Sequence, residues 1–258
     1  MHPSTKLANK TWKEGDDVDA FVVFPDDVSF HEARQLIGPV FGAHEPLTMW
    51  LLEGFENGKD PTLNACTMGL DIYNYLHVHG GTVLGKRGGN GALEAAAVIK
   101  VYESSSSSSS GGGCWNWLKG TIHFTKALLS IYWSTGVPLE LYHPKFKRER
   151  CQFLERVDLM RNGYVEGHKK AGLDGHYWYI AFVAVHSESQ GKGIGGELMR
   201  RIGQAADQQR MACYLETFGD KNIRFYRAVG YEVVANIELV DEKSQSTMSG
   251  VGMVRSAV

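Results

Sequence analysis

Cysteine, excess charge of one sign and long apolar runs are all scarce in this 258-residue chain. The four cysteines form no Cys-x-x-Cys pair, which excludes a zinc ribbon or a redox dithiol and suits a reducing compartment. Lysine and arginine total 27 against 29 acidic residues, so the basic surplus of a dedicated nucleic-acid-binding protein is missing. The longest apolar run, Tyr177–Val185, is too short to span a bilayer. We therefore expect no nucleic-acid partner and no membrane association.

The chain is long enough for one large domain or two small ones, and for a core that needs neither disulfides nor a metal. Residues 1–17 are polar and lack the apolar segment of a secretory signal, so we expect a flexible N-terminus and a cytoplasmic protein. Seven consecutive serines followed by three glycines predict a mobile surface loop over 103–113. A phosphorylated or regulatory element is the alternative for this loop.

Hydrophobic patterning predicts alternating strands and helices. Strands are expected at 18–24, 82–84, 92–102, 177–185, 212–217, 231–239 and 248–258. Helices are expected after Ser29, Pro46 and Pro61, across much of 114–170, and at 195–210 and 221–229. The charged, amphipathic stretch 145–170 is typical of a helix with one solvated face.

The most informative segment joins the strand ending at Val185 to the helix predicted at 195–210. A polar loop, 186–190, is followed by a glycine-rich turn, 191–196. Unpaired backbone N–H groups at such a turn, together with the positive end of the helix dipole, form a site for phosphate oxygens. Glycine allows close approach because it has no Cβ, and Lys192 adds a cation. The pattern indicates a phosphate-rich ligand, whereas a turn without a ligand is the alternative.

Two other phosphate-binding motifs are matched only formally. Gly191, Gly193 and Gly196 fit the dinucleotide fingerprint, and Glu216 lies where a ribose-binding acid would be. However, the loop separates the strand from the first glycine, and too little chain follows Glu216 to complete a Rossmann sheet. The stretch 80–86 resembles GxxxxGK, but Arg87 stands where Ser or Thr must hold magnesium, and its interior reads as a strand.

The turn 190–195, Gln-Gly-Lys-Gly-Ile-Gly, resembles the Q/R-x-x-G-x-G/A signature of the GNAT acetyltransferases. The elements around it, including 222–231 (NIRFYRAVGY), are similar to that superfamily in order and spacing. The strand entry 177–180 resembles puromycin acetyltransferase-like members that act on small molecules. The resemblance is specific over 176–239. It implies one α/β (α+β) domain over 18–258, with a mixed, mostly antiparallel central sheet flanked by helices.

The same resemblance implies a set of site residues. Backbone groups of the strand would run alongside the pantetheine arm of acetyl-CoA, and the amides of the glycine turn would cradle its pyrophosphate. Asn222, one helical turn before Tyr226, would face the cosubstrate. The residues assigned to acetyl-CoA in this way are Val183, Ala184, Val185, Gln190, Gly191, Lys192, Gly193, Ile194, Gly195, Gly196 and Asn222.

Direct acetyl transfer needs an acid for the leaving thiolate and a base for the amine. Tyr226 would lie near the sulfur, and a phenol stays protonated at neutral pH, so it suits the acid. The alternative is a buried aromatic that packs its helix. Glu216, at a strand end, is the candidate base, with a structural salt bridge as its alternative and His176 as a weaker candidate. The pair His77 and His79 lacks a third ligand nearby, so no metal is expected.

The resulting hypothesis is acetyl transfer from acetyl-CoA to a primary amine of a small molecule. One alternative is acetylation of protein N-termini or lysines. Another is a CoA-binding sensor module without turnover. The sequence predicts neither the acceptor nor the oligomeric state.

Overall fold

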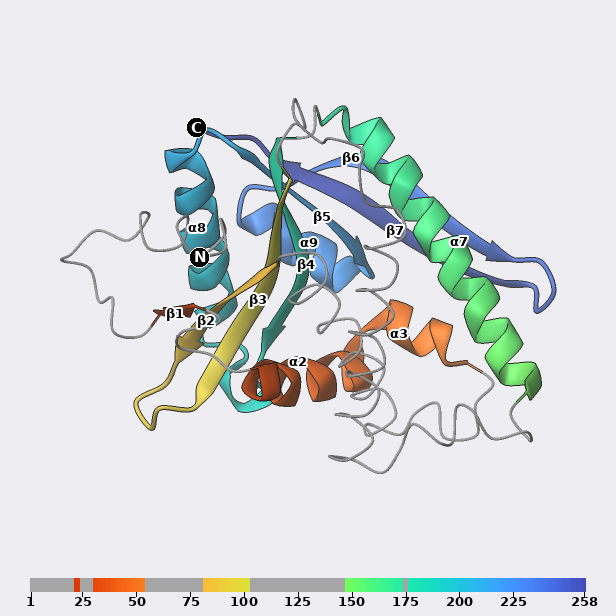
Figure 1. Cartoon of the computed structure of the whole chain (residues 1–258), viewed down its shortest axis with the longest axis horizontal. Coiled ribbons are helices and arrows are strands. Elements are labelled where there is room, and N and C mark those ends of the chain that lie inside the picture. Colours follow the sequence, from red (N-terminus) through yellow and green to blue (C-terminus); the bar gives the residue numbers. More distant parts are fainter. Residues whose placement is uncertain (1–20, 24–29, 54–80, 103–146, 174–175) are drawn as a thin grey trace, which may run out of the picture.

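The structure is a computed structural model that describes residues 21–23, 30–53, 81–102, 147–173 and 176–258. Within these ranges, seven strands form one sheet in the order β1-β2-β3-β4-β5-β7-β6 (Figure 1). The strands are β1 (Phe21–Val23), β2 (Thr82–Arg87), β3 (Leu93–Tyr102), β4 (Tyr177–Val185), β5 (Ala212–Phe218), β6 (Glu232–Asp241) and β7 (Ser246–Arg255). All neighbours are antiparallel except β4 and β5, so the predicted mixed, mostly antiparallel sheet is confirmed.

Helices cover both faces of this sheet (Figure 1). They are α2 (Phe30–His44), α3 (Pro46–Leu51), α7 (Lys147–Ala171), α8 (Ile194–Gln208) and α9 (Asp220–Ala228), with a short 3₁₀ turn, η4 (Ser187–Ser189). One face packs against α8 and α9, where Ile180 and Leu215 meet the apolar side of α8. The other face packs against α2, α3 and α7. Among the described residues, no helix is long and apolar enough to cross a membrane.

Amphipathic patterning explains how the elements of the C-terminal third pack. Apolar residues of α8 recur at helical spacing and are buried: Leu198, Met199, Ile202, Ala205 and Ala206. Strand β6 alternates strictly, with Ala235, Ile237, Leu239 and Asp241 buried. Asp241 occupies a position where the alternation calls for an apolar side chain, so a charged group enters the protein interior there.

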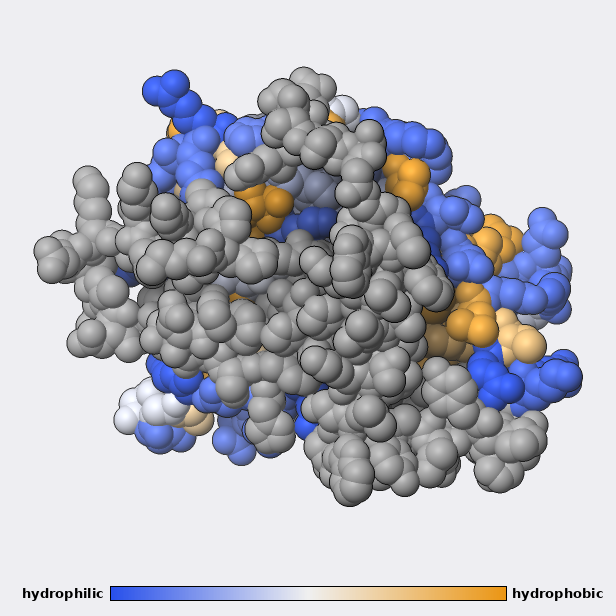
Figure 2. Space-filling model, viewed as in Figure 1, coloured by the Kyte–Doolittle hydropathy of each residue, from blue (hydrophilic) through white to orange (hydrophobic). Residues whose placement is uncertain are grey.

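Helix α7 lies across β6 and β7 (Figure 1) and approaches them closely because it presents two glycines to the sheet. A Cβ atom on Gly163 would lie 2.7 Å from a Leu239 methyl, and one on Gly167 would lie 2.8 Å from the Tyr214 hydroxyl. Its outer side carries charged residues, and the described surface in the same view is mostly hydrophilic with separate apolar patches (Figure 2). The predicted solvated face is therefore one side of a helix whose other side is deeply buried.

Most predicted elements appear with shifted ends. The strand expected at 82–84 continues to Arg87, so the GxxxxGK-like stretch is a strand from Thr82 onward and not a phosphate loop. The helix predicted at 195–210 runs from 194 to 208, and the last strand begins at Ser246 instead of Met248. The flexible N-terminus over 1–17, the loop at 103–113 and the helix after Pro61 lie outside the described residues.

Candidate functional site

Strands β4 and β5 separate after three residue pairs. They are paired only from Tyr177 to Tyr179 on β4 and from Ala212 to Tyr214 on β5. Beyond that point β4 remains bonded to β3, and β5 to β7. Within the described part of the sheet, the facing edges of 180–185 and 215–218 therefore carry backbone groups with no strand partner. Such an edge can accept hydrogen bonds from, and donate them to, an extended ligand.

A β-bulge lies beside this gap. The register between β3 and β4 shifts so that Val98 faces Phe182 while Ile99 faces Ile180, which leaves Ala181 as an extra residue. A bulge bends a strand and re-aims its backbone groups. The bulge therefore helps to turn the β4 edge away from β5 at the point where the two strands part.

The glycine turn lies at the open end of the gap. Gly191 and Gly193 have φ angles of 75° and 82°, in the left-handed region that favours glycine. A Cβ atom at either position would meet nothing within 4 Å, so the space over the turn is open. The Gln190 side chain donates to the Val185 carbonyl at 3.1 Å and fastens the turn to the end of β4.

The turn leads into α8 with free amides. Gly193 is the N-cap, and the bond from the Glu197 amide to the Gly193 carbonyl, at 3.0 Å, spans the first helical turn. The amides of the first four helix positions have no partner inside a helix, and no side chain caps this one. These N–H groups, the helix dipole and the exposed Lys192 together form an environment suited to an anion.

Helix α9 places Asn222 and Tyr226 on the opposite side of the gap. The Asn222 side chain donates to the Phe218 carbonyl at 3.1 Å, which ties the helix to the end of β5. The ring of Tyr226 packs edge-on against Phe225 and Tyr231. Burial raises the pKa of Tyr226, and the carboxylate of Glu45 raises it further.

Glu45 is a residue of this region that sequence reasoning missed. It caps α3 by accepting a hydrogen bond of 2.6 Å from the Thr48 amide. Burial raises its pKa, although the hydrogen bonds from Thr48 oppose that effect. The neighbouring Pro46 ring lies 3.2 Å from where a Cβ of Gly219 would be, so the α2–α3 corner meets the β5–α9 turn. The Glu-Pro pair at a helix start is the local signal that could have pointed to it.

Glu216 lies two positions beyond the last β4–β5 pair and points to the α7 side of the sheet. Its side chain is only 1% exposed, and its Oε1 lies 3.0 Å from Nε2 of His168 on α7. Nδ1 of the same imidazole lies 2.7 Å from the Tyr177 hydroxyl. Burial raises the pKa of Tyr214, and the neighbouring Glu216 carboxylate raises it further. Neither the Tyr214 hydroxyl nor Oε1 of Glu216 makes a hydrogen bond within the ordinary distance and angle limits. His168 gave no signal in the sequence, because its role depends on how α7 packs.

The predicted residues therefore fall around one gap. The turn at 190–196 stands at its open end, while Glu216 and Tyr226 approach it from opposite faces of the sheet. His176 lies at the exposed start of β4, and His77 and His79 lie outside the described residues. Within the described ranges, no group of three or more His, Cys, Asp or Glu side chains is placed to hold a metal ion.

Comparisons with known proteins agree with this geometry. Residues 127–231 match the Acetyltransferase (GNAT) family. The chain is also 32% identical over 72 residues to an uncharacterized N-acetyltransferase of Schizosaccharomyces pombe. That stretch is 28% of this chain and 29% of the yeast protein, so the likeness concerns less than a third of the relative's length.

Solved structures share the fold. A structure described as histone acetyltransferase HPA2 and related acetyltransferase, from Corynebacterium glutamicum, is 16% identical with a TM-score of 0.50 and covers 93% of this chain and 97% of its own. Arylalkylamine N-acetyltransferase 2 from Aedes aegypti is 13% identical with a TM-score of 0.53 and covers 92% and 99%. At such identities the likeness concerns architecture alone. Residues 127–231 therefore match the GNAT acetyltransferase family in sequence, and the described part of the chain has the fold of solved acetyltransferases.

Proposed function

We propose that the chain transfers the acetyl group of acetyl-CoA to a primary amine of a small molecule, by direct attack of the amine on the thioester. The observation that carries the proposal is the gap between β4 and β5, whose free strand edge leads to a turn of unpartnered amides. A long ligand with amide groups at one end and phosphates at the other matches that sequence of features. We treat residues 18–258 as one catalytic domain.

The described residues fit acetyl-CoA in two places. The β4 edge from Val183 to Val185 offers backbone groups to the amides of a pantetheine arm, in the manner of an added strand. The Val185 carbonyl is excepted, because it already accepts from Gln190. The amides from Gly191 to Gly196 offer donors to phosphate oxygens, and the open space at Gly191 and Gly193 admits them. Lys192 adds a positive charge at the surface beside the turn.

The transfer then follows from the groups that flank the gap. The neutral amine attacks the thioester carbonyl, a C–N bond forms, and the C–S bond breaks. Backbone N–H groups of the β4 edge stabilise the negative charge that develops on the carbonyl oxygen. Tyr226 gives its proton to the leaving thiolate, since its raised pKa keeps the phenol protonated until then. Glu216 takes the proton from the nitrogen.

Two features favour a small acceptor. The Glu216 side chain is 1% exposed, which disfavours contact of this carboxylate with a bulky acceptor. The overall charge is nearly balanced, at −2, which gives no broad field to attract charged protein tails. Acetylation of protein N-termini or lysines, and CoA binding without turnover, are the outcomes that would replace this assignment.

Release of free thiol from acetyl-CoA, measured with one panel of small amines and another of peptides, tests the function. We expect turnover with the amines, and a rate lower by about 10²-fold or more in Tyr226→Phe with unchanged CoA affinity. Turnover only with peptides would replace the acceptor class. CoA binding without any turnover would favour the alternative of a CoA-binding sensor module.

Calorimetry with CoA tests the turn separately. Gly193→Glu places a carboxylate against the phosphates and strains the backbone, so CoA affinity should fall by about tenfold or more. Gly91→Glu is the matched control, because Gly91 also has a positive φ of 78° and open space around it, but lies in the β2–β3 turn. Equal losses in both variants would contradict the assignment of the turn.

A further inference from the structure

His168 contacts Glu216 on the α7 side of the sheet and has no part in the proposed transfer. His168 comes from α7, which the chain inserts between β3 and β4. Its imidazole lies between the two strands that flank the gap, because Nε2 is 3.0 Å from Glu216 Oε1 on β5 and Nδ1 is 2.7 Å from the Tyr177 hydroxyl on β4. The ring therefore reaches from the first paired residue of β4 to a carboxylate two positions beyond the last paired residue of β5.

Four tyrosines enclose this imidazole. Its ring centroid lies 4.4 Å from that of Tyr214 and 5.3 Å from that of Tyr179, with Tyr177 and Tyr102 slightly farther away. The groups that face His168 and can ionise are thus Tyr102 on β3, Tyr177 and Tyr179 on β4, and Tyr214 and Glu216 on β5. Apart from the carboxylate they are phenols, so Glu216 is the one negative charge that these residues present to the ring.

The tautomer of His168 follows from its neighbours. Burial raises the pKa of Tyr177, with Tyr102 and Glu216 adding to the effect, so its hydroxyl keeps its proton. The hydroxyl can then donate to Nδ1, which places the proton of a neutral imidazole on Nε2, facing Glu216. The N–H group is near Oε1 but not aligned with it, a state in which catalytic hydrogen bonds are often found before substrate binds.

Building on the proposed function, we propose that His168 is the positioning residue for the base: its Nε2–H orients the Glu216 carboxylate to receive the proton of the acceptor nitrogen. The acceptor loses one proton to the carboxylate as its C–N bond forms, and the histidine keeps its own. Without His168, the buried carboxylate would lose the N–H group that holds its orientation.

The geometry distinguishes this role from simple packing. A purely structural contact would complete the hydrogen bonds of both partners, because buried polar groups normally have partners. Here Oε1 of Glu216 and the hydroxyl of Tyr214 lie close to each other, but neither makes a hydrogen bond within the ordinary distance and angle limits. Oε1 can therefore accept a hydrogen bond from an amine nitrogen.

Two readouts on the full chain test the proposal. The first is the nitrogen-15 NMR spectrum of the His168 imidazole, identified by the resonances that His168→Leu removes, which reports which ring nitrogen carries the proton. The second is the division of any rate loss between kcat and KM for the best amine. In the wild type the proton should be found on Nε2, and in His168→Leu kcat should fall by about tenfold or more with the KM for acetyl-CoA unchanged. His168→Gln, which restores an N–H donor at similar reach, should recover part of the lost kcat. Lys169→Leu, an exposed change one residue along α7, should alter neither readout.

An unchanged kcat in His168→Leu, or a proton on Nδ1 in the wild type, would overturn the role of His168. If the Leu variant does not fold, Tyr177→Phe replaces it, because loss of the hydroxyl releases Nδ1 and should lower kcat by a smaller factor. Absence of turnover in the wild type would count against the proposed function alone, since the NMR spectrum requires no substrate. Failure of the two proposals is therefore distinguishable.

Discussion

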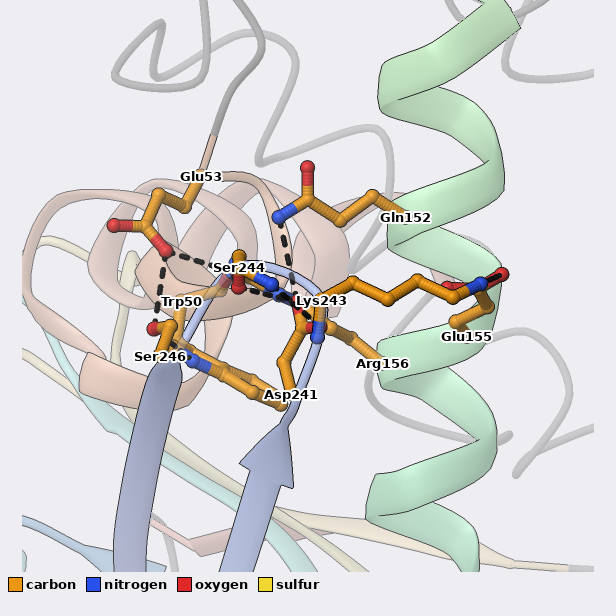
Figure 3. A network of polar contacts seen from close by, with 9 residues as sticks. All are labelled: Trp50, Glu53, Gln152, Glu155, Arg156, Asp241, Lys243, Ser244 and Ser246. Atoms are coloured by element: carbon orange, nitrogen blue, oxygen red, sulfur yellow. Dashed lines mark hydrogen bonds and ion pairs between the residues drawn. The ribbon is translucent and has the colours of Figure 1, made fainter.

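Helix α7 holds two buried polar clusters that differ in how completely their groups are bonded. Arg156 is fully buried and uses its whole guanidinium: Nε donates to Asp241 at 2.8 Å, Nη2 donates to Glu53 and Ser244, and Nη1 donates to the Trp50 carbonyl. Figure 3 shows these side chains converging from α3, α7 and the β6–β7 turn. Farther along the same helix, His168 meets Glu216, where a buried carboxylate oxygen and a phenol lack bonds of ordinary geometry.

The difference separates a structural role from a chemical one. A charge taken out of water is stable only when its bonds are satisfied, and the Arg156 cluster meets that condition with an additional stack of the guanidinium on the Trp50 ring. It joins three elements that are distant in sequence. The Glu216 cluster is unsatisfied at a comparable depth, which costs stability and leaves a site for another molecule. Substitutions in the Arg156 cluster should therefore lower stability, and substitutions at Glu216 should lower activity.

The largest effect is expected from Arg156→Met. The change leaves the Asp241 carboxylate buried without its main partner, which should lower the free energy of unfolding by about 3–5 kcal/mol. Urea denaturation measures this value. Arg161→Met on the same helix is the control, because its pair with Asp158 is more than two thirds exposed on both sides and should contribute about 0–0.5 kcal/mol. Similar losses of unfolding free energy in both variants would show that the contacts of Arg156 do not stabilise the fold.

Glu216→Gln should lower activity and leave stability almost unchanged, in contrast to Arg156→Met. An amide keeps the shape of the carboxylate but cannot take a proton, so kcat should fall by about 10²–10⁴-fold. Removal of a buried and poorly bonded charge should leave the free energy of unfolding within about 1 kcal/mol of the wild type, or raise it. Thiol release and urea denaturation on one preparation give both numbers. A large loss of stability with full activity would make Glu216 a structural residue.

Acid should remove the stabilising contribution of the Asp241 carboxylate gradually, over a pH range that begins near 4 and extends well below it. Burial alone would raise the pKa of Asp241, but hydrogen bonds from Ser244, Arg156 and Gln152 outweigh it and hold the pKa well below the usual range. A carboxyl with a depressed folded-state pKa contributes stability that is complete above its unfolded pKa, near 4, and is lost as the pH falls below that value.

Stability should therefore decline below about pH 4 in the wild type, and the decline should be shallower by roughly 1–3 kcal/mol in Asp241→Asn. Thermal or urea unfolding between pH 7 and pH 2 measures both curves. Asp207, whose pKa is lowered by hydrogen bonding to Arg255, supplies part of the slope that remains. Parallel curves for the two proteins would mean that Asp241 is not held ionised by its neighbours.

The order of elements could be predicted from the sequence wherever local patterns determine structure. Neighbouring residues determine the turn with left-handed Gly191 and Gly193, the start of α8 and the alternation of β6. The separation of β4 from β5 has no such local signal, since it depends on pairing partners far along the chain. Its presence was implied only by the resemblance of the turn to a known family.

The two clusters on α7 were beyond sequence reasoning for a different reason. Arg156 and His168 occur in a helix of mixed charge, where most such residues face water. What distinguishes them is contact with Asp241 and Glu216, which lie 85 and 48 positions away along the chain. Only the two glycines of α7, four residues apart, hinted that one side of the helix approaches another element closely.

Alanine substitutions at these two glycines should have the smallest effects on stability. Alanine favours a helix over glycine by about 1 kcal/mol, which opposes any clash that the new methyl group causes. At Gly163 the methyl group meets the mobile end of Leu239, so Gly163→Ala should stay within about 0.5 kcal/mol of the wild type. At Gly167 it meets the Tyr214 hydroxyl on a rigid ring beside His168 and Glu216. Gly167→Ala should therefore lose about 1 kcal/mol and also lower kcat, as measured by urea denaturation and thiol release. Equal behaviour of the two variants would mean that the spacing of α7 over β5 does not govern the incomplete cluster, and that its geometry is maintained from β4 and β5 alone.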